Sequence, residues 1–175
     1  MPARLEPLPP EQWDDLVKAL ATRPPEGGER ALNIFTTLDR HPDLFRRWVA
    51  LGGALLNGKL DSRRRELVIL RTAHHCQSDY EWAQHVPIAA SVGVEQEEID
   101  ALQNRLDSHQ WVETDLLILE AADELHETFG LTDRTWHRLS DHFDAPSLIE
   151  LVMLVAFYHL VALMISALQI QIEDF

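Results

Sequence analysis

Residues 62–93 read SRRRELVILRTAHHCQSDYEWAQHVPIAASVG, and the spacing of their apolar side chains decides the fold. Apolar residues recur every three or four positions over 62–76 and again over 79–92, a period typical of helices. Asp61 or Ser62 can cap the first of these helices. Because the connection is short, the two helices should pack as antiparallel neighbours. The stretch therefore predicts a central antiparallel helical hairpin.

The rest of the chain shows the same helical period and no convincing alternation typical of strands. Further helices are expected over residues 10–22, 29–39, 43–57, 95–106, 113–129, 132–142 and 146–172. The sequence thus predicts an all-α protein. A Pro/Gly-rich stretch at 24–28 predicts a hinge. We therefore expect an N-terminal helix and hinge in residues 1–28, and a helical domain in 29–175, within a single globular domain overall.

Composition restricts the function. The chain has 175 residues, 46% of them hydrophobic, and a net charge of -14, which is typical of a soluble globular protein that repels phosphate backbones and anionic lipids. Nucleic acid and membrane surfaces are therefore not expected as partners. Cys76 is the only cysteine, so no disulfide can form within the chain. The N-terminus lacks the apolar core of a secretory signal, and we expect a cytoplasmic protein.

One apolar segment has about the length needed to cross a bilayer, residues 151–168. Tyr158, His159 and Ser166 interrupt it, and no second such segment exists. A helix that is apolar on all sides is also typical of a protein centre or a subunit contact. We favour that interpretation and expect a homo-oligomer.

Ionisable side chains gather in the hairpin. Ser78, Glu81 and His85 fall at i, i+3 and i+7 of the second helix, so they share one stripe. Glu66, in the first two turns of the preceding helix, could meet His85 across the hairpin. Groups able to hold or move a proton would then line one wall. The alternative, an ion pair in a satisfied polar seam, remains open.

The same residues resemble a known family. The segments RELVILRTA (65–73) and YEWAQH (80–85), followed by Ala89 and Gly93, are similar to the core of the carboxymuconolactone decarboxylase family. Its superfamily also holds alkyl hydroperoxidase D. The resemblance covers about residues 30–105. It implies an alkyl hydroperoxidase D-like helical bundle that forms trimers or hexamers, with active sites near subunit boundaries.

In the hydroperoxidase branch, the resemblance implies a glutamate, a Cys-x-x-Cys pair and a histidine that relays protons to the thiols. The matching positions are Glu66, Ser78, Glu81 and His85, so both thiols are missing. Cys76 lies two residues before the first of the thiol positions and does not simply replace either sulfur. Peroxidase activity is therefore a disfavoured alternative.

In the decarboxylase branch, Glu81 and His85 stand where the family carries a glutamate and a histidine. The resemblance implies loss of carbon dioxide from a small carboxylated lactone without a cofactor. His85 is then the expected proton carrier, Glu81 orients it, Glu66 is a second carboxylate and Ser78 a possible donor. Substrate-binding candidates are Arg65, Arg71, Tyr80 and Trp82. The remaining alternative is a non-catalytic helical oligomer that binds a ligand.

The nine histidines raise the question of a metal. His74, His75, Glu81 and His85 lie close in sequence but match no zinc-binding motif, so we expect no metal site. Three others, His126, His137 and His142, fit ordinary surface positions. An imidazole at His159, within the apolar segment, needs a polar partner if it is buried.

Overall fold

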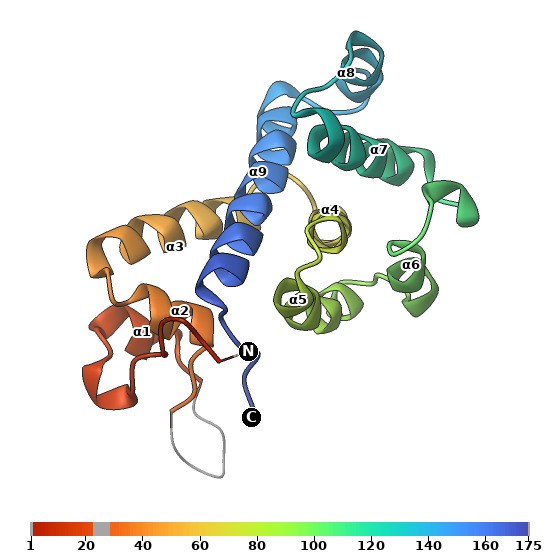
Figure 1. The fold of residues 1–175 in the computed structure, drawn as a ribbon. Helices are drawn as coiled ribbons and strands as arrows, with labels where there is room; N and C mark the ends of the chain where they lie inside the picture. Colours follow the sequence, from red (N-terminus) through yellow and green to blue (C-terminus); the bar gives the residue numbers. More distant parts are fainter. Residues whose placement is uncertain (1, 23–28, 175) are drawn as a thin grey trace. The chain divides into compact units, whose positions relative to one another are not determined.

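The computed structural model describes residues 2–22 and 29–174. Within these residues it contains no named strand, which confirms the all-α class (Figure 1). The described part of the chain forms α1 (Asp15–Leu20), α2 (Asn33–Leu38), α3 (Pro42–Leu56), α4 (Ser62–His75), α5 (Asp79–Ser91), α6 (Gln96–Ala101), α7 (Glu113–Thr128), α8 (Asp133–Ser140) and α9 (Ala145–Leu168). The expected hinge at 24–28 lies outside the described residues, so the division predicted there stays a prediction.

The first predicted helix is the one that differs most from the structure. A short 3-10 turn (Pro10–Gln12) is followed by a separate α1. The break has a local cause, because Asp14 adopts an extended backbone and caps α1. Its carboxylate accepts hydrogen bonds from the backbone N–H groups of Leu16 (2.7 Å) and Val17 (3.3 Å). An N-cap residue lies outside the helix it starts, so a continuous helix through Asp14 is excluded.

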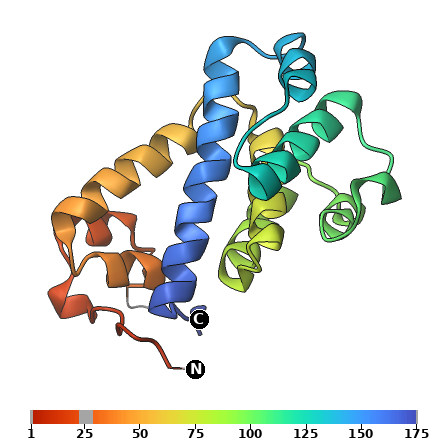
Figure 2. The same ribbon diagram turned by 45° about the horizontal axis from the view of Figure 1, so that its top comes forward.

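The chain divides into two compact units, with boundaries inside α3 and α9. The first comprises the described residues of Met1–Gly53 and Leu163–Phe175. Its core holds Trp13, Val17, Ala31 and Phe45. Near the end of α9, the Leu168 carbonyl accepts a 3.0 Å hydrogen bond from the backbone N–H of Arg4, where the N-terminal segment approaches that helix (Figure 2).

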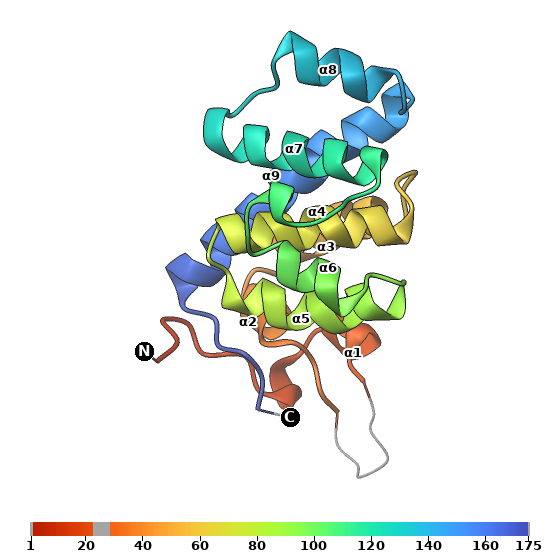
Figure 3. The same ribbon diagram turned by 90° about the vertical axis from the view of Figure 1, so that its right-hand side faces the viewer.

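The second unit, Ala54–Ala162, contains the predicted hairpin. Helix α4 lies between α5 and α7 (Figure 3). Its residues 66–73 are all buried, so this part of the helix, polar side chains included, is enclosed by protein on every side. The hairpin is antiparallel, because Arg63 at the start of α4 donates to the Gly93 carbonyl just after α5 (3.3 Å).

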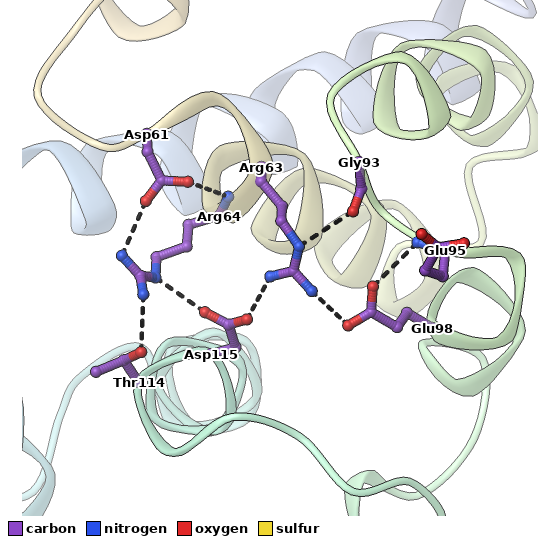
Figure 4. Close-up of polar contacts among 8 residues, drawn as sticks. All are labelled: Asp61, Arg63, Arg64, Gly93, Glu95, Glu98, Thr114 and Asp115. Atoms are coloured by element: carbon purple, nitrogen blue, oxygen red, sulfur yellow. Dashed lines mark hydrogen bonds and ion pairs between the residues drawn. The ribbon is translucent and has the colours of Figure 1, made fainter.

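An ion-pair network, hereafter the Asp115 network, fixes the start of α4 to α6 and α7 (Figure 4). Asp115, 2% exposed, accepts from the guanidinium groups of both Arg63 and Arg64. Arg63 also binds Glu98 on α6. These arginines therefore pair with acidic side chains of α6 and α7. The contacts position the first turn of α4, directly before Glu66.

A carboxylate from α9 holds the segment that leads into α4. Glu150 accepts hydrogen bonds from the backbone N–H groups of Lys59 and Leu60, the latter at 3.0 Å. A β-carbon at Gly58 would lie 2.5 Å from the Glu150 carboxylate, so a larger residue there would force that carboxylate to shift. We call these contacts the Glu150 clamp. Through them α9 is tied to the beginning of α4.

Helix α9 is long and apolar enough to cross a membrane by length and composition, and half of its most apolar window is buried. Burial of this kind is also found in the core helix of a folded protein. Three large apolar side chains on its second-unit part remain exposed: Ile149 (64%), Met153 (40%) and Leu160 (44%). Their spacing of four and seven residues places them on one stripe.

Candidate active site

Glu66 and His85 meet across the hairpin, as its geometry predicts. Glu66 is completely buried on α4. One carboxylate oxygen accepts from Arg65 Nε at 3.0 Å, and the other lies 2.7 Å from Nδ1 of His85 on α5. The His85 side chain is 13% exposed, so the imidazole lies near the surface of the unit while its carboxylate partner is sealed inside.

Tyr158 of α9 completes this group. Its hydroxyl lies 3.1 Å from His85 Nε2, and the two rings meet edge to face with centroids 5.1 Å apart. Burial, and after it the charges of Glu66 and Glu81, raise the pKa of Tyr158, so the phenol keeps its proton. The Tyr158 O–H then donates to Nε2, and Nδ1–H donates to Glu66. We call Glu66, His85 and Tyr158 the relay.

Sequence reasoning did not assign Tyr158 to the site. It lies 73 residues from His85 in the sequence. The apolar pattern of its helix predicts that the side chain is buried, but not which residue it contacts. One signal was available: a phenol within a buried apolar helix normally needs a hydrogen-bond partner. That rule predicts a partner without saying which residue supplies it.

Glu81 does not orient His85, although the sequence predicted that it would. Both ring nitrogens of His85 are engaged by Glu66 and Tyr158, so Glu66 occupies the orienting position expected for Glu81. Glu81 is 2% exposed, and its carboxyl oxygens have no hydrogen-bond partner within residues 2–22 and 29–174. Burial raises the pKa of Glu81 to about 7, although the adjacent Ser78 side chain opposes the rise. Near neutral pH this carboxyl therefore exists in both protonation states.

Ser78, Tyr80 and Trp82 lie near Glu81 in the sequence and differ in their exposure. Ser78 immediately precedes α5 and is buried, and its hydroxyl lacks a well-formed hydrogen bond in the described part of the chain. Tyr80, a candidate for substrate binding, is only 5% exposed and does not line the cleft described next. Trp82 is half-buried. Ser78 and Trp82 both line a cleft of about 440 Å³, hereafter the α4–α5 cleft, together with Ala73, His74, His75, Gln77, Asp79 and Gln103.

The two candidate arginines both bind other parts of the protein. Arg65 pairs with Glu66 and donates to the Leu56 carbonyl at 2.6 Å. Arg71 is 6% exposed and binds both oxygens of Asp123 as well as two backbone carbonyls. In this structure neither guanidinium faces the α4–α5 cleft.

Cys76 forms the C-cap of α4 and is a free, half-buried thiol. Burial, and the charge of Glu81 after it, raise the pKa of the thiol to about 11. A thiol with this pKa carries almost no thiolate at neutral pH, and thiolate is the form that attacks peroxides. The environment of Cys76 therefore disfavours one-cysteine peroxidase chemistry.

Solved structures share this fold. An uncharacterized peroxidase-related protein with an alkylhydroperoxidase AhpD core, from Ralstonia eutropha JMP134, is 21% identical with a TM-score of 0.74, over 82% of this chain and 78% of the other. An uncharacterized peroxidase-related protein from Silicibacter sp. TM1040 is 12% identical with a TM-score of 0.75, again over 82% of this chain and 78% of the other. The debrominase Bmp8, in complex with 2,3,4-tribromopyrrole, is 16% identical with a TM-score of 0.80, over 99% of this chain and 94% of the other. At these identities the likeness shows the fold alone, an alkyl hydroperoxidase D-like helical bundle.

The sequence itself was compared with curated proteins and with family models. No curated protein matches the chain. Residues 42–124 match the model of the carboxymuconolactone decarboxylase family, in agreement with the fold of the solved structures. The matched segment contains α4 and α5, and with them Glu66, Glu81 and His85. Residues 42–124 of this chain therefore belong to the carboxymuconolactone decarboxylase family.

Proposed function

We propose that the protein is a cofactor-independent decarboxylase, or a related proton-transfer enzyme, acting on a small carboxylated lactone or acid. The observation that carries this proposal is the relay, in which a buried carboxylate and a phenol hold both nitrogens of one imidazole. A ring fixed from both sides has a defined orientation for proton transfer. Membership of the family supports the same reaction class.

The proposed reaction balances without a redox partner. The bond between the substrate's α-carbon and its carboxylate breaks, carbon dioxide leaves, and the electron pair delocalises onto the lactone carbonyl as an enolate. The imidazolium form of His85 then gives its Nε2 proton to that carbon, directly or through the Tyr158 hydroxyl. Glu66 holds the opposite nitrogen throughout, and water returns the proton to His85 afterwards.

The α4–α5 cleft is the proposed entrance for the substrate. His85 does not line it, but Trp82, one helical turn earlier on α5, does. Glu81 directly precedes Trp82 in the sequence, and its buried carboxyl oxygens have no hydrogen-bond partner among the described residues. In its protonated form the Glu81 carboxyl can donate a hydrogen bond to an anionic oxygen. This would stabilise the enolate as its charge develops.

The test is carbon dioxide release from a panel of carboxylated lactones by the full-length protein. His85→Ala should lower release by about 100-fold or more, because the proton carrier is lost. Tyr158→Phe should lower it less, by about 10-fold, since it removes only the hydroxyl that orients the ring. His142→Ala is the matched control, because His142 is exposed on the surface.

Circular dichroism and thermal unfolding establish that each variant folds. The proposal is overturned if the unmodified protein releases no carbon dioxide from any member of the panel. It is equally overturned if folded His85→Ala retains the activity of the His142→Ala control.

A further inference from the structure

A second cluster of reactive side chains lies outside the relay. Cys76 at the end of α4, His126 on α7 and His159 on α9 each offer one metal-binding atom, and these atoms all lie within 4.8 Å of one another. All three side chains are half-buried. His126 was expected at the surface, and the structure corrects this, because its ring stacks on His75 within the second unit.

The hydrogen bonds of His159 fix which nitrogen is available. Its Nδ1 lies 2.8 Å from the Val155 carbonyl, which can only accept, so Nδ1 carries the proton. In the neutral ring Nε2 then holds a lone pair. It points at Nδ1 of His126, 2.9 Å away. A histidine that donates one N–H to a backbone carbonyl and presents the other nitrogen is typical of metal-ligating histidines.

The ring of His126 is positioned by His75, which is in turn held by Asp123 and Arg71. Its ring stacks nearly parallel on His75, with centroids 4.6 Å apart and 13° between planes. His75 in turn donates to Asp123 at 2.6 Å, and Arg71 binds the same carboxylate. Without a metal, Nδ1–H of His126 must donate to Nε2 of His159. With a metal ion bound, His126 would take its other neutral tautomer, with the proton on Nε2, and the two facing nitrogens would both bind the ion.

We propose that Cys76, His126 and His159 form a binding site for a zinc ion, with a fourth position left for water or another ligand. Two imidazoles and one thiolate are a donor set that zinc prefers. Zinc bonds of roughly 2.0–2.3 Å at tetrahedral angles place donor atoms about 3.3–3.7 Å apart. The observed 2.9 Å between nitrogens, and the 4.8 Å limit for the set, require shifts of only about 1 Å.

The site is distinct from the relay in its residues, although α4 and α9 contribute to both. Three protein ligands and one open position are typical of catalytic rather than purely structural zinc sites. The inference does not rest on the proposed decarboxylase activity, and every measurement below can be made without a substrate.

The experiment uses the full-length protein treated with a chelator and then titrated with zinc or cobalt(II). We expect one ion per chain by calorimetry. The cobalt(II) form should show the visible absorption of a four-coordinate ion and a near-ultraviolet charge-transfer band from a cobalt–sulfur bond. Bound zinc should also protect Cys76 from alkylation.

Variants distinguish zinc binding at this site from nonspecific zinc binding by other histidines. Cys76→Ser should abolish the charge-transfer band, and His126→Gln and His159→Gln should each weaken zinc binding by about 100-fold. His74→Gln is the matched control, since His74 neighbours His75 but lies outside the three ligands, and it should bind zinc normally. The proposal is overturned if cobalt(II) gives no sulfur band, or if folded His126→Gln and His159→Gln bind zinc as tightly as the His74→Gln control.

Discussion

Two buried glutamates on facing helices have contrasting surroundings. Glu66 is completely buried but has Arg65 and His85 as partners. Glu81 is nearly as buried, and no hydrogen-bond partner for its carboxyl oxygens is found among the described residues. A buried carboxylate without partners is unfavourable, and the carboxyl responds by keeping its proton to higher pH. The two side chains are therefore suited to different roles: Glu66 is a hydrogen-bond partner held in place by Arg65 and His85, and Glu81 is a group that titrates near neutral pH.

The raised pKa of Glu81 predicts a pH-dependent stability. Below about pH 4.5 the carboxyl is protonated in both folded and unfolded chains. As pH rises from 4.5 towards about 7, the unfolded chain releases the proton while the folded protein keeps it. The free energy of unfolding should therefore fall across this window, by an amount on the order of 3 kcal/mol. Glu81→Gln stays neutral and should lack this contribution.

The measurement is denaturant unfolding of the unmodified protein and Glu81→Gln between about pH 4 and pH 8. The variant should become the more stable of the two as pH rises. Glu97→Gln, at an exposed position on α6, controls for the loss of one negative charge. A pH-independent difference between Glu81→Gln and the unmodified protein would contradict the prediction.

At the scale of elements, the α4–α5 turn joins the relay to the proposed zinc site. Cys76 ends α4, Gln77 adopts a left-handed backbone with φ 53°, and the Ser78 N–H closes the turn on the Ala73 carbonyl at 2.9 Å. Glycine is the usual residue at such a position, because a β-carbon is unfavourable there. The turn therefore stores a small strain between the relay residues on α4 and α5 and next to the proposed zinc ligand Cys76.

Gln77→Gly should raise the free energy of unfolding by about 0.5–1 kcal/mol, because it relieves that strain. Gln77→Ala keeps the β-carbon and should give no such gain, which makes it the matched control. Urea denaturation of the three proteins is the measurement. Equal stability of the glycine and alanine variants would show that the backbone at residue 77 is not strained.

The Asp115 network gives a second prediction at this scale. Asp115→Ala leaves Arg63 and Arg64 without their shared acceptor, yet both arginines are about 30% exposed and can recover water contacts. We expect a loss of about 3 kcal/mol in the free energy of unfolding, at the lower end for a buried pair. Glu113→Ala, an exposed acid in the same first turn of α7, should change stability by less than about 0.5 kcal/mol. Comparable losses in both variants would argue against the network as the cause.

At the scale of the whole molecule, we propose that the exposed stripe Ile149, Met153 and Leu160 on α9 binds a second copy of the chain. Three large apolar side chains aligned on one helix face are unusual for a surface that meets only water. A homo-oligomer would cover them.

Light scattering after size-exclusion chromatography checks this proposal. The unmodified protein should have a mass of a multiple of 20.1 kDa, and Leu160→Glu should shift it towards the single chain. Phe129→Glu is the control, because Phe129 is 90% exposed and follows α7, outside the α9 stripe. A monomeric unmodified protein would exclude the proposal.

The sequence predicted much of this fold and part of the site, for physical reasons. Helix period and capping are local properties, so α4, α5 and their antiparallel hairpin were predictable, and with them the contact of Glu66 with His85. Tyr158 and the Cys76–His126–His159 cluster were not, because their contacts cross between helices distant in the chain. The break at Asp14 is not predictable from the helical period, because an aspartate there fits the polar face of a continuous helix as well as an N-cap.

The Glu150 clamp has a consequence for how this protein can vary. Glu150 accepts hydrogen bonds from the segment before α4. Eight positions later on the same helix, Tyr158 forms a hydrogen bond with His85. Adding or deleting a single amino acid between them would rotate everything downstream by about 100°. The oxygen now on the imidazole would give way to the benzyl group of Phe157 or to the ring of His159. Insertions and deletions can therefore be accommodated in the loops of this chain. Between Glu150 and Tyr158 the number of residues must stay the same, although the residues in between can be substituted.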